Sequence, residues 1–419
     1  MTSPTHFSAS RATYLPTQLT SVAVGLLTAV CLIVPSGYSI GSVMLFIAGV
    51  GLIIARRLPV LSKQDLWVIA ALLAYATVAM LEAWWDGQGS RGLDKPSRFI
   101  LAIPALLWVL RYPPRLAYLW GGVAIGAITA GSWGGWQKLV EGVGRAQGHT
   151  HVIQFGNLSM LLGVLCMAGL GWAVIQRHRL IWVALLAFGA AGGVLGSLFS
   201  GSRGGWVGFP IVLLVLYRAY GSQLSKKLKL AVLAAIIAGG ATVYAVPQIG
   251  VQERIHQAFN DVALYISGEN RSTSVGSRFE MWRGAAQLIQ EKPLTGWGSN
   301  GYASAMAEFG EVGVISTEAA QYGHAHNEFI DAFAKRGLLG LVVLLALYLV
   351  PMRLFARHLQ ASHLSTRSVA TAGVLLPVTF MDFGLTQVFM EHNSGVMMYA
   401  FLLAALWGAY VNQVAESSN

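Results

Sequence analysis

Apolar stretches long enough to cross a lipid bilayer recur along almost the whole chain. One crossing takes roughly twenty apolar residues. Hydrophobic residues make up 55% of the 419 residues and charged residues only 11%, whereas a soluble globular protein carries about 25% charged residues. We therefore predict an all-α polytopic membrane protein with about twelve transmembrane helices. The apolar stretches begin near Leu19, Ile40, Leu66, Phe99, Leu116, Asn157, Leu180, Trp206, Leu228, Leu338, Val369 and Val396.

Basic residues gather in alternate connections between these stretches. If the N-terminus is cytoplasmic, the cytoplasmic connections hold only Asp65 and Glu416 as acids. Cytoplasmic loops of membrane proteins carry an excess of Lys and Arg, so we expect both termini in the cytoplasm. The net charge of +10 then reflects topology and does not indicate nucleic-acid binding. The basic residues on that side are Arg11, Arg56, Arg57, Lys63, Arg111, Arg115, Arg177, Arg179, Arg218, Lys226, Lys227, Lys229, Arg353, Arg357 and Arg367.

The long polar connections all fall on the opposite, outer side. We expect residues 1–249 to form nine transmembrane helices, 250–327 a large outer loop with short helices, and 328–419 a short outer helix followed by the last three spans. The chain has no Gly-rich nucleotide-binding motif. The sequence therefore predicts a protein that works at the outer face.

An arginine stands near the start of a predicted helix in the large outer loop. Ser277 and Glu280 have the spacing of a capping box, and apolar residues recur at helical spacing until Pro293. Arg278 would then lie in the first turn, where free backbone N–H groups and the helix dipole favour an anion. The spacing fits an exposed arginine on a surface helix equally well. Weaker candidates of the same kind are Arg271 and Arg283.

A second arginine, Arg203, lies at the outer mouth between two spans and is flanked by Ser202, Gly204 and Gly205. Neighbours without bulk allow such a side chain to point into a cavity and to bind phosphate bidentately. The alternative is an arginine that extends to the lipid headgroups.

The segment around His326 is the most informative part of the outer loop. Asn327 can cap a short helix that Gly337 ends before the next span. The positive end of the helix dipole would keep the His326 ring neutral near pH 7 and able to accept a proton. His324 and His326 could instead bind a metal together with a carboxylate, although His-x-His is weak support for that. Tyr322 is a further supporting candidate.

Asp382 is an acid within the outer half of an apolar span. Intramembrane acids are costly and usually pair with a cation or orient a histidine. Asp382 could also be a buried partner of an arginine with no part in catalysis. Other charged or titratable residues on the outer side, which the sequence does not rank, are Arg98, Arg145, Glu391 and His392.

These motifs together resemble those of the bacterial O-antigen ligase and O-antigen polymerase superfamily. His326-Asn327, followed after nine residues by Gly337 and then by Gly340, looks like the ligase signature. The segment from Ser202 to Trp206 is similar to the family's outer arginine segment. The pattern in the large outer loop is similar to the family's large periplasmic loop, on the basis of Arg278, Trp282, Pro293, Gly296 and Gly298.

The resemblance implies a GT-C-like glycosyltransferase of the bacterial inner membrane with its active site facing the periplasm. It implies an inverting, metal-independent transfer without a cofactor, from an undecaprenyl-diphosphate-linked glycan to a sugar hydroxyl of lipid A–core. Arg203 and Arg278 would bind the diphosphate and His326 would act as the general base. The residues implied as possible support are His324, Asn327, Asp382, Arg145 and Tyr322.

Three other functions remain open from the sequence. A polymerase of the same superfamily would show paired Arg-x10-Gly motifs, and the outer side offers Arg145 to Gly156 alone. A protein O-oligosaccharyltransferase is the second alternative. A secondary transporter or lipid flippase is the third, but transporters place charges near the bilayer midplane and these spans are nearly free of charge.

Overall fold

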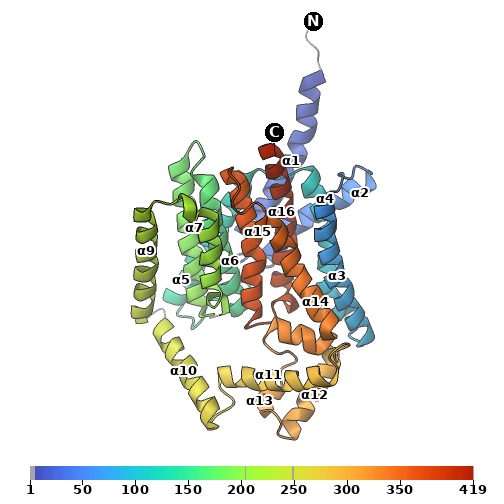
Figure 1. The fold of residues 1–419 in the computed structure, drawn as a ribbon, viewed down its shortest axis with the longest axis vertical. Coiled ribbons are helices and arrows are strands. Elements are labelled where there is room, and N and C mark those ends of the chain that lie inside the picture. The colour runs from blue at the N-terminus through green and yellow to red at the C-terminus, as the bar shows by residue number, and fades with distance from the viewer. Residues whose placement is uncertain (1–4, 203, 248–249, 419) are drawn as a thin grey trace.

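A computed structural model describes residues 5–202, 204–247 and 250–418, and the regular structure in these ranges is helical (Figure 1). The prediction of an all-α protein is thereby confirmed. The helices are α1 (Thr5–Ala29), α2 (Gly37–Ile54), α3 (Lys63–Trp85), α4 (Gly89–Arg111), α5 (Leu116–Leu139), α6 (Val152–Ala173), α7 (Arg179–Ser200), η1 (Gly204–Trp206), α8 (Phe209–Tyr220), η2 (Gly221–Gln223), α9 (Lys226–Ala245), α10 (Val251–Ser267), α11 (Ser274–Glu291), α12 (Ser299–Glu311), α13 (Thr317–Ala320), α14 (Glu328–Ala356), α15 (Leu364–Gly384), η4 (Phe389–Glu391) and α16 (Asn393–Ser418).

Within the described ranges, 10 helical segments are long and apolar enough to span a membrane, so this is a multi-pass membrane protein. Two of the expected spans, α1 and α4, fall short of that apolar length. Helix α4 begins with a charged portion that contains Asp94, Lys95 and Arg98. Both helices nevertheless pack inside the bundle, α1 against α2 and α5, and α4 against α2, α3 and α16.

The bundle has a buried centre and one peripheral helix. Of the most apolar stretch of each helix, 83% is buried in α6, 83% in α15 and 94% in α16. No residue of the α9 stretch is buried, and Figure 1 shows α9 at the side of the bundle, above α10. A helix that is apolar on all sides and unburied suits contact with lipid.

The two ends of the bundle differ. The start of α1 and the end of α16 lie at one end, and α10 to α13 lie beyond the other (Figure 1). We call residues 251–320 the cap. The cap and the first turns of α14 share a small apolar core of their own, which contains Met281, Leu288, Tyr302 and Met306.

Helix α14 bends sharply at Gly337, as the sequence predicts. Gly337 has φ 61° and ψ −165°, and a side chain there would collide with the carbonyl oxygen of Leu294. The loop before α12 packs against this bend, since the N–H groups of Trp297 and Gly298 donate to the carbonyls of Ala334 and Lys335 at 3.0 and 2.8 Å. The glycines of that loop therefore bring two backbone segments together.

Buried ion pairs fix the first half of α14 in place. Lys335 is only 1% exposed and lies 2.9 Å from both Asp331 and Glu391. Arg336 pairs with Glu82 of α3 at 3.3 Å. These contacts join α14 to η4 and α3, so the segment just before it, which carries His326, has a rigid support.

Helix α11 begins earlier than the sequence analysis expected. Its N-cap is Thr273, whose hydroxyl accepts a hydrogen bond from the Gly276 N–H at 3.1 Å. The capping box assigned to Ser277 and Glu280 is wrong, because Glu280 accepts hydrogen bonds from Tyr265 and from the Ser316 N–H instead. Arg278 consequently lies in the second turn, beyond the free N–H groups of the helix start.

Candidate active site

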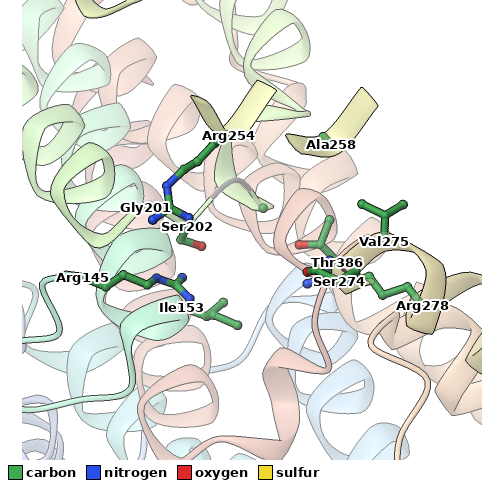
Figure 2. Close-up of a pocket in the computed structure, with 11 residues that line it drawn as sticks. Arg145, Ile153, Gly201, Ser202, Arg254, Ala258, Ser274, Val275, Arg278 and Thr386 are labelled. Atoms are coloured by element: carbon green, nitrogen blue, oxygen red, sulfur yellow. Dashed lines mark hydrogen bonds between the residues drawn. The ribbon is translucent and has the colours of Figure 1, made fainter. Parts of the chain in front are cut away.

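A cavity of about 300 Å³ lies where the cap meets the bundle, and three arginines contribute to its lining (Figure 2). We call it the guanidinium cavity. Arg145 reaches it from the loop before α6, Arg254 from α10 and Arg278 from α11. Guanidinium groups are always charged and match the oxygens of phosphate in geometry. The other lining residues are Ile153, Gly201, Ser202, Gly204, Ala258, Ser274, Val275 and Thr386.

Each arginine is positioned by a different contact. The Arg145 Nε donates to the Ser200 carbonyl at 2.9 Å, and the Arg278 Nη1 donates to the Ser274 carbonyl at 3.2 Å. The Arg254 guanidinium lies against Gly201, where an added Cβ would be 2.7 Å from its Cζ. Gly201 also has φ +61°, so a glycine is required there both for the turn and for the contact.

Arg203, the other predicted diphosphate ligand, lies outside the described residues. Its neighbours Ser202 and Gly204 both line the guanidinium cavity. The Ser202 hydroxyl donates to Asn157 Oδ1 of α6 at 3.2 Å, which fixes that end of the segment on the bundle.

Asp382 holds the start of α8. Its Oδ1 accepts a hydrogen bond from the Gly208 N–H at 2.6 Å, immediately before the first residue of that helix. The sequence suggested that Asp382 pairs with a cation or orients a histidine, whereas this partner is a backbone N–H group. It secures the chain four residues after Gly204, beside the guanidinium cavity.

The His326 loop has the cap that the sequence predicts and an unusual backbone. Asn327 Oδ1 accepts from the Phe329 and Ile330 N–H groups at 3.0 and 3.1 Å, which confirms it as the N-cap of α14. His326 itself has φ 48°, a left-handed conformation that few non-glycine residues adopt. Its N–H donates to His324 Nδ1 at 3.3 Å, and the Tyr322 ring lies 5.5 Å from its ring centroid.

The surroundings of His326 favour its neutral form. The pKa of His326 is lowered to about 4, mainly by burial and also by the His324 ring and the positive charge of Arg278, while Gln387 acts in the opposite direction. The sequence analysis expected a neutral ring because of the helix dipole, whereas here burial is the main cause that favours the neutral form. A neutral ring at pH 7 can accept a proton.

His326 lies beside the guanidinium cavity without lining it. Arg278 is close enough to influence the His326 ring electrostatically and lines the cavity as well. One turn further along α11, Trp282 Nε1 donates to the Ala325 carbonyl at 2.9 Å. Helix α11 thus connects the arginine and the histidine loop.

Asp331, a carboxylate that acts electrostatically on His324, is engaged with other groups. Asp331 accepts a hydrogen bond from the Ala325 N–H at 2.9 Å and pairs with Lys335. In the described ranges, no group of three or more His, Cys, Asp or Glu side chains is arranged to hold a metal ion.

The sequence analysis did not identify Arg254 or Gln387. Arg254 follows a left-handed Gly250 on an amphipathic helix, and nothing in its local sequence distinguishes it from other exposed arginines of the outer loop. Gln387 follows the end of α15, and its Nε2 lies 3.2 Å from His392 Nε2. Only the tertiary structure brings these residues to His326 and the cavity.

Comparison with known proteins shows which sequences this chain is similar to. Residues 188–345 match the family model described as O-antigen ligase, a range that includes Arg254, Arg278 and His326. A Haemophilus influenzae protein described as uncharacterized is 29% identical over 388 residues, which cover 90% of this chain and 95% of the relative.

A second relative carries the name O-antigen ligase. This Escherichia coli K12 protein is 29% identical over 150 residues, about a third (33%) of each chain. The family match covers α10 and α11, which carry Arg254 and Arg278, and the loop that carries His326, whereas Arg145, Ile153 and Thr386 of the cavity lining lie outside it. Residues 188–345 of this chain are therefore similar to the O-antigen ligase family.

Proposed function

We propose that this protein is an inverting, metal-independent O-antigen ligase of the bacterial inner membrane. It transfers a glycan from undecaprenyl diphosphate to a sugar hydroxyl of lipid A–core at the periplasmic face. The observation that carries this proposal is the meeting of Arg145, Arg254 and Arg278 in one cavity, with Arg278 close enough to His326 to act on its ring electrostatically. The family match supports the same reaction class.

The guanidinium cavity suits the diphosphate of the donor. Charge-assisted hydrogen bonds from arginine to phosphate are short and strong, and the three arginines approach from different segments (Figure 2). Arg203 completes this set in our proposal, because both of its neighbours line the cavity. These positive charges stabilise the negative charge that develops on the leaving diphosphate, a task that a divalent cation often performs.

His326 is proposed as the general base. Its ring takes the proton from the acceptor hydroxyl, and the hydroxyl oxygen attacks the anomeric carbon of the donor sugar. The bond between that carbon and the diphosphate oxygen breaks, and its electron pair leaves with the diphosphate. Attack from the face opposite the leaving group inverts the anomeric centre. General-base assistance of this kind contributes roughly 10²–10⁴-fold.

The proposal places the cap in the periplasm. The basic connections predicted as cytoplasmic belong to the end of the bundle where α14 finishes and α15 begins, and Arg353 and Arg357 lie there. The cap lies at the opposite end (Figure 1). The chain then has its termini in the cytoplasm, its large periplasmic loop at residues 250–327 and its reaction site under that loop.

Reconstitution tests this function directly. The purified protein in lipid nanodiscs receives undecaprenyl-diphosphate-linked O-antigen glycan and lipid A–core, with and without EDTA, and products are separated by mass. We expect lipid A–core that carries the glycan through a new, inverted glycosidic bond. A longer donor-linked glycan instead would indicate a polymerase, transfer to added protein would indicate an oligosaccharyltransferase, and loss of transfer on adding EDTA would contradict the metal-independent mechanism.

A further inference from the structure

A second cavity of about 300 Å³ lies next to the guanidinium cavity. We call it the amide–imidazole cavity. Its lining is mainly neutral and polar, with Lys95 and Glu391 as charged groups of opposite sign. The neutral residues that matter here are Thr150, His151, Gln154, His392, Asn393 and Ser394.

Two short segments separate the two cavities. At the start of α6, Ile153 lines the guanidinium cavity while His151 and Gln154 line the amide–imidazole cavity. In the segment after α15, Thr386 lines the first cavity, and the next residue, Gln387, contacts His392 in the lining of the second. The two cavities therefore adjoin at the start of α6, and Gln387 contacts the second cavity only through His392.

Gln387 also connects the amide–imidazole cavity with the proposed base. Its Nε2 lies 3.2 Å from His392 Nε2, and its side chain influences the His326 ring. His392 in turn stacks on His151, with ring centroids 6.5 Å apart. A ligand in the amide–imidazole cavity would thus lie one side chain away from His326.

Gln154 is the residue of this cavity that points to a ligand. It is only 1% exposed, and neither its amide nitrogen nor its amide oxygen has a hydrogen-bond partner in the described part of the chain. Buried polar groups in proteins are nearly always hydrogen-bonded, so such an exception calls for an explanation. A bound molecule that both donates and accepts hydrogen bonds would satisfy both atoms.

Sugar hydroxyls have this dual character. Amide, imidazole and hydroxyl side chains also donate and accept, whereas guanidinium groups only donate. The amide–imidazole cavity therefore matches a carbohydrate as the guanidinium cavity matches a diphosphate. Because the amide–imidazole cavity lies beside Gln387, a carbohydrate bound there would lie next to a donor bound in the guanidinium cavity.

We propose that the amide–imidazole cavity binds the acceptor sugar and that Gln154 hydrogen-bonds its hydroxyl groups, presenting the reactive hydroxyl to His326 past Gln387. This inference rests on the proposed function and adds the location of the acceptor. It assigns a binding task to residues just before and at the start of α6 and to residues next to η4.

The variant Gln154→Met tests it. The substitution roughly conserves volume and removes no hydrogen bond within the described residues, so the melting temperature should not fall. We expect the KM for lipid A–core to rise about tenfold through the loss of two hydrogen bonds, with the KM for the donor unchanged. The matched control is Gln176→Met, just beyond the other end of α6, where the amide donates to the Trp172 carbonyl at 3.1 Å. That variant should leave both KM values unchanged.

A binding measurement without donor tests this inference separately from the proposed function. Deacylated core oligosaccharide, added without donor, should raise the melting temperature of the wild type and not that of Gln154→Met. Equal stabilisation of the two proteins, an unchanged acceptor KM, or a parallel rise in both KM values with a lower melting temperature would each overturn the acceptor site. If the wild type transfers no glycan, the proposed function fails, and the binding measurement still decides whether the cavity binds carbohydrate.

Discussion

The guanidinium cavity and the amide–imidazole cavity have nearly the same volume and opposite chemistry. The first gathers Arg145, Arg254 and Arg278, and the second gathers neutral groups around Gln154 and His392. The start of α6 contributes to both linings, through Ile153 in the first and Gln154 in the second. The comparison shows that two neighbouring cavities can differ in chemistry, one with positive charge for a diphosphate and one with groups that donate and accept hydrogen bonds for a sugar. In our proposal the general base, His326, lies near both cavities.

The largest expected effect concerns the residue between the two cavities. His326→Asn should lower kcat by about 10²–10⁴-fold, because the general base is lost. Asparagine tolerates the left-handed backbone at this position better than alanine does, so the loop should keep its shape. Binding of undecaprenyl diphosphate, measured by a thermal shift, should stay unchanged. A variant with wild-type kcat would remove His326 from the chemistry.

Substituting the arginines of the guanidinium cavity should weaken donor binding without affecting acceptor binding. Arg254→Gln and Arg278→Gln should each weaken undecaprenyl diphosphate binding by about 10- to 100-fold, as expected for a lost charge-assisted hydrogen bond. The KM for the acceptor should change little. Both constants can be measured with the purified variants in nanodiscs.

Arg283→Gln is the matched control for these variants. Arg283 lies on α11 as Arg278 does, but its side chain is half exposed, lies 3.9 Å from Glu280 and is absent from the cavity lining. Donor affinity should be that of the wild type. A loss equal to that of Arg278→Gln would mean that general positive charge, rather than the cavity, binds the donor.

The pH profile should show a smaller effect that links the arginine to the base. Because burial lowers the pKa of His326 to about 4, kcat/KM should stay level through neutral pH and fall only as pH drops towards that value. In Arg278→Gln a positive charge is removed, so the pKa of His326 should rise and the acid limb should move to higher pH. A wild-type limb near pH 6.5, the ordinary histidine value, would contradict this electrostatic environment.

The smallest effect is expected at Asp382. In Asp382→Asn the amide oxygen can still accept from the Gly208 N–H, so only the charge-assisted part of that bond is lost. We expect at most about a fivefold fall in kcat/KM, through a less firmly held α8. Complete loss of transfer would show that Asp382 takes part in the reaction itself.

The sequence predicted the helical class, most of the spans and the break at Gly337, because these follow from apolar length and local backbone chemistry. The Asn327 cap was predicted for the same local reason. The predicted start of α11 was wrong, because Glu280 accepts hydrogen bonds from Tyr265 and Ser316. Only the tertiary structure brings these two residues near Glu280. Arg254, Gln387 and Gln154 could not be ranked, because their surroundings come from distant segments.

The most direct test is an experimental structure of the protein in nanodiscs with undecaprenyl diphosphate bound. The proposal places the diphosphate in the guanidinium cavity, in contact with Arg254 and Arg278, with its glycan-bearing end towards His326. A diphosphate bound at the opposite end of the bundle, or in the amide–imidazole cavity, would contradict the proposed reaction site.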